Sequence, residues 1–355
     1  MARTRGITIK DVARRAGVSI TAVSHALNDK GTLSPATRAH IRVVADEMGY
    51  EADALARGLR RSTMGAVGLV LRSLDALGDY APAGVDVFER FVGAAASQAL
   101  ARGLSLMLVP DLTRAPVPPL AFSLDGYIVT NPHVDDPVIA RLEERGIPYV
   151  TYGRPPGRPD FTHWASEDDA VSARLVLDHL AAGGARSVAL VRGTDPNAWN
   201  LEHQELYLGW CAERGSTPRL YELPERAGVE GGADLAGRLL DDGLPDAVFC
   251  LTGRHAAGVQ RGLKARGVRV PAQTMVVAGS DSEHARNSRP AISALELNPV
   301  DSSAALLDIL QSLIAGRPAE APRLTRARFR PRASTRRASR RGAARRRGGA
   351  GRRCG

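Results

Sequence analysis

The pattern of apolar residues changes near Gly65, and this change restricts the chain to two different kinds of domain. Before this point, apolar residues recur at helical spacing in three short segments. After it, unbroken apolar strands alternate with amphipathic helices, beginning with a strand at 66–71 and a helix at 86–102. Such repeated strand–helix units are typical of parallel sheets with helices on both faces. A chain of 355 residues is long enough for two or three domains.

Three helices are predicted in the first fifty residues by their start and stop signals. Thr8 is placed to cap the first helix, and Gly17 ends it because glycine accepts the left-handed conformation of a tight turn. Ser19 begins the second helix, and Ser34, followed by proline, begins the third. Two helices joined by such a turn form a helix-turn-helix unit, whose second helix enters the major groove of DNA. A small three-helix core without a partner is the alternative.

The first residues of the second helix are the candidates for contact with base edges. They are Ile20 and Thr21, with His25 one turn later on the same face. Thr21 could also be only a helix-start residue, and His25 only a surface histidine.

Net charge is distributed unevenly along the chain. Residues 1–62 carry a net charge of +5, residues 63–320 a net charge of −9, and residues 321–355 contain 14 Arg and no acidic residue. Only the two basic ends are therefore candidates to meet a polyanion such as DNA. The end of the chain is of low complexity and is expected to be disordered. It either adds non-specific affinity for nucleic acid or is an extension with no role.

The stretch from Ile7 to Asn28 resembles the DNA-binding headpiece of the LacI/GalR family of transcription regulators. The resemblance continues through 34–38, 48–50 and 54–60. It implies a hinge helix over 54–60, in which Leu59 wedges into the minor groove; such wedges unstack a base step and are offset by contacts to the bent duplex. A core leucine in a linker helix is the other interpretation of Leu59. Where the family usually has proline two residues after the tyrosine, this chain has Ala52.

The DNA-binding residues that follow from the motif and the resemblance lie in the helix-turn-helix unit and the hinge. The arginines among them are expected to contact phosphates without reading sequence. The full set is Thr8, Ser19, Ile20, Thr21, Ser24, His25, Asn28, Arg57, Leu59 and Arg60.

The middle of the chain is similar to the family's effector domain, which resembles a periplasmic sugar-binding protein with two subdomains around a cleft. Ligands of open α/β sheets bind beyond the carboxyl ends of the strands. Asp281 could instead be a turn residue, and Trp199 a packing residue. The expected effector-binding residues are Asp86, Phe88, Asn131, Arg154, Trp199, Asn200, Arg254 and Asp281.

Three departures from the family limit what the resemblance implies. Gly153 and Gly253 stand where the family often has aspartate, so sugar specificity does not transfer directly. The proline-rich segment 110–124 stands where the family has a crossover helix, and its prolines forbid a regular helix.

The predicted fold class is α/β, with an all-α helix-turn-helix headpiece and a two-subdomain, periplasmic-binding-protein-like parallel α/β core. The expected domains are the headpiece 1–50, a hinge 51–62, an effector-binding and dimerisation domain 63–333, and a disordered tail 334–355. Within 63–333, one subdomain is expected to comprise about 63–160 with 292–320, and the other 161–291 with 321–333. Chain crossings between them are expected near 155–165, 287–293 and 320–330.

These features predict a repressor that binds a pseudo-palindromic operator as a homodimer and responds to a small molecule, a sugar or related metabolite. A solute-binding protein would lack the headpiece. An enzyme is disfavoured because no dinucleotide, phosphate-loop or nucleophile-elbow motif is present. No cofactor or metal is expected, since the three cysteines lack metal-site spacing. Without an apolar signal region or membrane span, a cytoplasmic location is expected.

Overall fold

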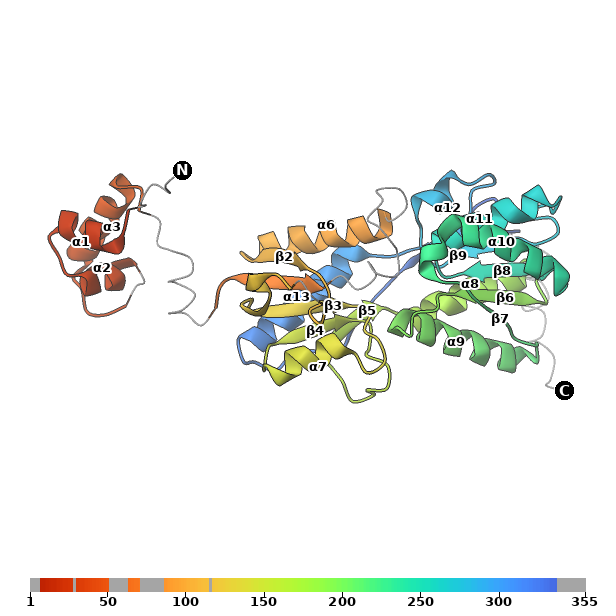
Figure 1. The fold of residues 1–355 in the computed structure, drawn as a ribbon, viewed down its shortest axis with the longest axis horizontal. Coiled ribbons are helices and arrows are strands. Elements are labelled where there is room, and N and C mark those ends of the chain that lie inside the picture. The colour runs from red at the N-terminus through yellow and green to blue at the C-terminus, as the bar shows by residue number, and fades with distance from the viewer. Residues whose placement is uncertain (1–6, 28–29, 51–62, 71–85, 115–116, 337–355) are drawn as a thin grey trace, which may run out of the picture. The chain divides into compact units, whose positions relative to one another are not determined.

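The chain forms two compact units, which meet at Gly65 in the sequence (Figure 1). The computed structural model describes residues 7–27, 30–50, 63–70, 86–114 and 117–336. Within these ranges no helix is both long enough and apolar enough to span a membrane.

The described residues of the first unit include a bundle of three helices. They are α1 (Ile9–Ala16), α2 (Ile20–Leu27) and α3 (Pro35–Glu47). The predicted signals are confirmed: Gly17 has φ 67°, and the Ser34 hydroxyl accepts a hydrogen bond from the Thr37 amide at 3.1 Å. The helices enclose a small apolar core that includes Val12, Val23 and Ile41, which have no exposed surface.

The second unit contains two six-stranded sheets, each with its own helices; we call these halves lobe I and lobe II. The lobe I sheet has the strand order β11-β5-β4-β3-β1-β2, and all of its strands are parallel. Its strands are β1 (Ala66–Val70), β2 (Ser105–Val109), β3 (Gly126–Thr130), β4 (Tyr149–Tyr152), β5 (Trp164–Glu167) and β11 (Arg323–Thr325). Its helices are α6 (Asp86–Ala101), α7 (Pro137–Glu144) and α13 (Pro299–Ile314), with a 3₁₀ turn η1 (Pro119–Phe122).

Lobe II has the strand order β12-β10-β9-β8-β6-β7, in which only β12 runs antiparallel to its neighbour. Its strands are β6 (Val188–Arg192), β7 (Arg219–Glu222), β8 (Ala247–Cys250), β9 (Met275–Ala278), β10 (Ser293–Glu296) and β12 (Arg328–Arg330). Its helices are α8 (Asp169–Ala182), α9 (Ala198–Arg214), α10 (Gly228–Asp241), α11 (Gly253–Ala265) and α12 (Glu283–Asn287), with a 3₁₀ turn η2 (Glu225–Ala227).

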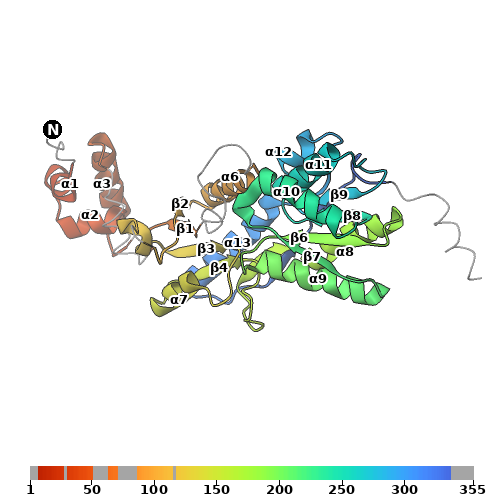
Figure 2. The ribbon, with the colours of Figure 1, turned by 45° about the vertical axis from the view of Figure 1, so that its right-hand side comes forward.

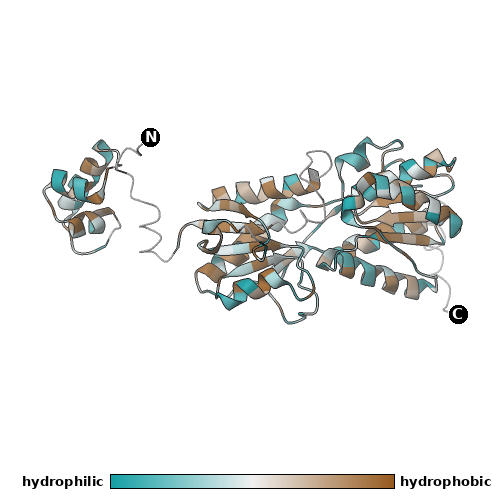
Figure 3. Ribbon diagram, in the orientation of Figure 1, coloured by the Kyte–Doolittle hydropathy of each residue, from teal (hydrophilic) through white to brown (hydrophobic). Residues whose placement is uncertain are grey.

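Alternate residues along the strands pack against helices on opposite faces of each sheet. In lobe I, Leu69 packs with α6 and α13, whereas Val70 packs with α7. In lobe II, Leu190 packs with α8 and α9, whereas Val191 packs with α10 and α11. In Figure 2, α9 lies on the other side of the lobe II sheet from α10 and α11. Figure 3 shows the apolar colour concentrated on the strands, as expected for sheets buried on both faces.

The subdomain boundaries expected from the sequence are wrong at three short strands. β5 and β11 belong to the lobe I sheet, and β10 belongs to the lobe II sheet. Main-chain pairing decides this: Leu324 of β11 is in register with Ser166 of β5, and Ser293 of β10 with Val277 of β9. The chain therefore crosses between the lobes at 168, at 297–298 and at 326–327, so only the third expected crossing is confirmed.

The proline-rich segment contains no α-helix in its described residues, 110–114 and 117–124, as its prolines predict. It forms the 3₁₀ turn η1, which buries Ala121. Among the described residues of the second unit, the helices α7, α10, α12 and α13 were not predicted. Two of them carry a start signal, because an acidic or amide cap precedes a proline: Asp136 caps α7 and Asn298 caps α13.

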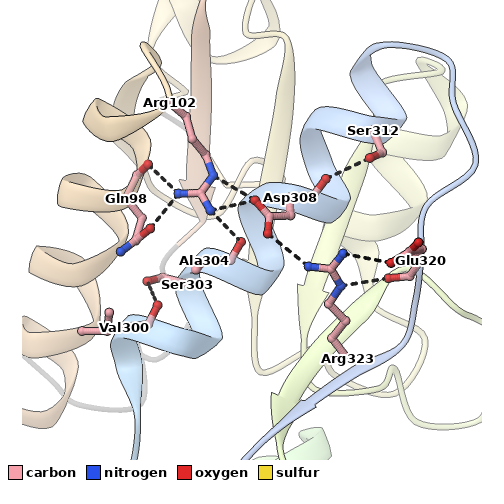
Figure 4. Close-up of polar contacts among 9 residues, drawn as sticks. All are labelled: Gln98, Arg102, Val300, Ser303, Ala304, Asp308, Ser312, Glu320 and Arg323. Atoms are coloured by element: carbon pink, nitrogen blue, oxygen red, sulfur yellow. Dashed lines mark hydrogen bonds and ion pairs between the residues drawn. The ribbon is translucent and has the colours of Figure 1, made fainter.

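Asp308 on α13 clamps three elements of lobe I together (Figure 4). Arg102, at the end of α6, donates to Asp308 Oδ1 from Nη2 at 2.7 Å and from Nε at 3.0 Å. Arg323 of β11 donates from Nη1 to the other oxygen, Oδ2, at 3.1 Å. Because one carboxylate serves both arginines, α6 and β11 are held to the same turn of α13.

Helices α10 and α11 approach so closely that their contact requires glycine. A Cβ atom at Gly258 would lie 2.1 Å from the carbonyl oxygen of Val229 and 2.8 Å from the Cα of Gly232. These are backbone atoms, which cannot move aside as a flexible side chain can.

Gly258→Ala is predicted to lower the free energy of unfolding of the full chain by about 3 kcal/mol, because the helices must separate. Urea denaturation measures it. Gly209→Ala is the matched control: this helical glycine on α9 is exposed and has nothing within 4 Å of an added Cβ. It should raise stability by about 0.8 kcal/mol through helix propensity. Equal effects of the two substitutions would contradict the glycine contact.

Candidate functional site

The N-terminal turn of α2 forms an exposed surface on the first unit. Ser19, Ile20 and Thr21 are exposed, and Ile20 keeps 44% of its surface in contact with solvent. Burial of Val23 and Ala26 in the bundle core fixes which face of α2 points outward. An apolar side chain beside a hydroxyl suits the methyl groups and polar edges of bases in a major groove.

Several residues that are predicted to contact DNA also form hydrogen bonds or packing contacts within the first unit. The Ser19 hydroxyl accepts from the Ala22 amide at 3.1 Å, and the Thr8 hydroxyl donates to Asp11 at 2.6 Å. His25 is half-buried, and a Cβ atom at Gly31 would lie 2.4 Å from its Nδ1. Its ring therefore rests against the turn after α2. Ser24 is half-buried on the same helix.

The remaining predicted DNA contacts are Asn28, Arg57, Leu59 and Arg60, which lie outside the described residues, as do the hinge 51–62 and tail residues 337–355. Their roles stay predictions.

A cavity of about 230 Å³ lies between the two lobes of the second unit. Its walls come from the carboxyl ends of strands in both sheets. Thr130 ends β3 and Asn131 follows it, Tyr152 ends β4, and Thr252 follows β8. This is where ligands of open α/β sheets bind.

Five of the eight predicted effector residues line this cavity. Arg154 is exposed outside the lining, and the side chain of Asp86 lies outside the described residues. Asp281 is also absent from the lining. The five that the structure brings together are Phe88, Asn131, Trp199, Asn200 and Arg254.

The side-chain amide of Asn200 forms most of its possible hydrogen bonds within the protein. Its Oδ1 accepts from the Gly193 amide at 3.0 Å, and its Nδ2 donates to the Asp195 carbonyl at 3.0 Å and to Glu225 Oε1 at 2.7 Å. With 2% of its surface exposed, it orders the loop after β6 that forms one wall. Arg254 donates to the main-chain oxygen of Glu225 at 3.0 Å, which fixes the adjacent wall.

Asp281 has a structural contact instead of the expected cavity position. Its carboxylate accepts from both terminal nitrogens of Arg332, at 2.9 and 2.7 Å. Its main-chain oxygen accepts from Arg90 on α6, at 2.5 Å. The residue thus joins the loop after β9 to the C-terminal segment and to lobe I.

Sequence reasoning missed all five carboxylates among the described residues that line the cavity. Glu167, at the end of β5, accepts from the Tyr152 hydroxyl, from the Ser302 hydroxyl at 3.0 Å and from the Asn298 amide at 3.2 Å. These bonds hold the crossing at 297–298 and the start of α13 against the end of β5. No sequence signal marked Glu167, because only the fold buries it.

Asp169 and His203 form a second buried polar group beside the cavity. Asp169 lines the cavity and is 7% exposed, and its Oδ1 lies 4.0 Å from His203 Nε2. Burial, and then the nearby carboxylates led by Glu202, raise the pKa of Asp169 well above its usual value. Burial lowers the pKa of His203 to about 4, so this imidazole is neutral at pH 7.

Comparison with known proteins assigns both units. The family model for bacterial regulatory proteins of the lacI family matches residues 8–53, and that for a periplasmic binding protein-like domain matches residues 177–335. A transcriptional regulator in the aml 5′ region of Streptomyces limosus is 30% identical over 288 residues, covering 78% of this chain and 79% of that protein. The regulator CelR of Thermobifida fusca is 29% identical over 310 residues, covering 83% and 88%.

Solved structures share the fold. The Lac repressor dimer bound to operator and the anti-inducer ONPF superposes with a TM-score of 0.76 at 21% identity, covering 93% of this chain and 99% of that one. The CelR–cellobiose complex gives a TM-score of 0.65 at 23% identity, covering 92% and 99%.

Burial of His203 makes stability dependent on pH. As the pH falls from 6.5 towards 4, the unfolded chain takes up a proton at His203 that the folded chain excludes. The free energy of unfolding should therefore fall by about 1.4 kcal/mol per pH unit on account of this residue. His203→Gln removes the titrating group, so its slope between pH 6.5 and 4.5 in urea denaturation should be shallower by that amount. Parallel slopes would contradict the buried neutral imidazole.

Proposed function

The chain belongs to the LacI family of bacterial regulatory proteins, and we propose that it is a repressor whose affinity for operator DNA is controlled by a small molecule in the cavity of the second unit. Members of this family are DNA-binding transcription regulators, so the chain is not an enzyme. Its site of action is the cytoplasm, where bacterial DNA is found.

The observation that carries this function is the exposed first turn of α2 on a buried three-helix core. Ile20 and Thr21 face outward there, at the place from which a recognition helix contacts base edges. Leu59, Arg57 and Arg60 complete the interface as a minor-groove wedge and phosphate contacts. The cavity supplies the second binding site that a ligand-controlled regulator requires.

A homodimer on a pseudo-palindromic operator is the expected assembly, because two identical headpieces related by a twofold axis read two inverted half-sites. The Lac repressor is a dimer in its operator complex, which supports this assembly for a chain of the same fold. The proposed domain scheme is a headpiece 1–50, a hinge 51–62, an effector-binding and dimerisation domain that begins at 63, and a C-terminal tail. The expected start of the tail at 334 is wrong, because Ser334 and Thr335 are buried and hydrogen-bonded to Ser293 of β10, so the second domain extends at least to 335.

The effector is proposed to be a sugar or related metabolite. CelR, a relative, is described in complex with cellobiose. Cavity-lining aromatic residues such as Phe88 and Trp199 supply apolar surface, and the surrounding carboxylates supply hydrogen-bond acceptors for hydroxyl groups.

Selection of bound sequences from random duplex DNA tests the function directly. The full chain should enrich two inverted half-sites without any added small molecule. Thr21→Ala should change the base preferred within each half-site, at about 1–3 kcal/mol per lost contact. Thr217→Ala, an exposed threonine of the second unit, is the matched control and should enrich the wild-type sequence. No enrichment by the wild-type chain would overturn the function, and an unchanged site with Thr21→Ala would remove that residue from base contact.

A further inference from the structure

The cavity between the lobes is lined by more acidic than basic side chains. Among its described lining residues, the carboxylates are Asp169, Asp195, Glu167, Glu202 and Glu225, and the guanidinium groups are Arg90 and Arg254. An anionic ligand would meet repulsion in such a site, since charges in a partly buried cavity are weakly screened.

Most of these charged groups already hold protein partners. Glu167 accepts three hydrogen bonds, and Glu225 accepts from Asn200 and from the Thr194 amide. Arg90 and Arg254 each donate to a main-chain oxygen. Asp169 differs, because its Oδ1 is buried and has no hydrogen-bond partner in the protein.

The atom that faces Asp169 is Nε2 of His203, and it too is a hydrogen-bond acceptor. His203 Nδ1 lies 3.0 Å from the carbonyl oxygen of Trp199. A carbonyl only accepts, so Nδ1 carries the proton and Nε2 of the neutral ring presents a lone pair. Nε2 has no partner either, and it lies 4.0 Å from Asp169 Oδ1. A donor at about 2.8 Å from each atom would satisfy both.

Electrostatics favours a donor that also carries positive charge. Burial raises the pKa of Glu202, and the neighbouring Glu205 and Asp168 add to this effect, while Arg154 opposes it. Glu202 is in turn the nearby charge that contributes most to raising the pKa of Asp169. A cation between these carboxyl groups would stabilise the charged form of both, as an opposite charge within a few ångströms does.

We propose that the effector is a polyhydroxylated primary amine of the amino-sugar class, whose ammonium group donates to Asp169 and lies beside Glu202 in the inter-lobe cavity. This assignment rests on the proposed function of the cavity as an effector site. An ammonium group provides three donors and one positive charge, which matches an unpaired carboxylate oxygen with a second carboxyl nearby. The ring and hydroxyl groups of the same molecule would meet Phe88, Trp199 and Asn131 on the cavity walls.

Isothermal titration calorimetry of the full chain with three matched series tests the proposal. The probes are glucosamine, glucose and glucuronate; galactosamine, galactose and galacturonate; and mannosamine, mannose and mannuronate. In at least one series the amine should bind about tenfold or more tightly than its neutral member, because a charge-assisted bond contributes about 1.4 kcal/mol or more. Glucuronate and its analogues should bind most weakly. A neutral or acidic member that binds best, or no binding by any amine, would overturn the proposal.

The substitution Asp169→Asn removes the negative charge and keeps nearly the same side-chain shape. This nearly isosteric change should reduce the affinity for the preferred amine to that for its neutral sugar, and leave the affinity for the neutral sugar within about twofold. Glu230→Gln is the matched control, because it removes a carboxylate that is 82% exposed and paired with Arg261 on the outside of lobe II. It should preserve the preference. An amine preference that survives Asp169→Asn would mean that a water occupies the gap, and would also overturn the proposal.

Calorimetry in the absence of DNA distinguishes a failure of the proposed effector class from a failure of the proposed regulator function. If the amine preference is absent while the ligand-free chain still selects an operator, the effector class is wrong and the regulator function stands. If the amine binds but no operator is selected, the ligand class of the cavity stands and the regulator function is wrong.

Discussion

The ion pair between Asp281 and Arg332 is the interaction on which the arrangement of the second unit depends. Asp281 is 5% exposed, and both of its carboxylate oxygens are bound by one guanidinium group. Removing one member of such a pair leaves a buried charge and costs about 3–5 kcal/mol. The pair fastens the segment after β12 to the loop after β9, and Arg90 ties the same loop to α6 of lobe I. Helix α6 is therefore held at one end by lobe II and at the other by the Asp308 clamp within lobe I.

This arrangement explains how the cavity can couple to the rest of the chain. The lobes are joined by three short crossings, and the hydrogen bonds of Glu167 and of Asp281 lie at or beside them. A ligand that changes the contacts across the cavity changes the relative free energies of two lobe arrangements, which is the physical content of allostery. Oδ1 of Asp169 has no hydrogen-bond partner in the protein, so a ligand that donates to it would contribute to this difference in free energy.

Local signals were enough to predict the headpiece and the central strands. Gly17 marks the end of a helix through its backbone geometry, the Ser34–Pro35 pair marks the start of another, and the apolar run that begins at Ala66 indicates a strand buried on both faces. The short strand β11 could not be assigned to its sheet, because its place depends on pairing with β5, which lies far away in the sequence. Helix α10 has four glycines in fourteen residues, a composition that disfavours helix, yet close packing against α11 requires it.

The candidate site was predictable only in part for the same reason. Phe88, Trp199 and Asn200 were found through resemblance, whereas the chemistry of Asp169 and Glu202 arises from burial that no local pattern encodes. Asp281 shows the converse, since resemblance to the family's effector domain suggested a ligand contact, whereas long-range pairing with Arg332 gives it a structural role.

The central claim is that occupancy of the cavity and binding of operator are linked, and one thermodynamic cycle measures this. The sugar or amine with the highest affinity in calorimetry is titrated into the full chain with and without saturating selected operator. The account predicts that operator changes the ligand's dissociation constant by the same factor, about fivefold or more, by which ligand changes the operator's. A ligand affinity that is identical with and without operator would contradict it.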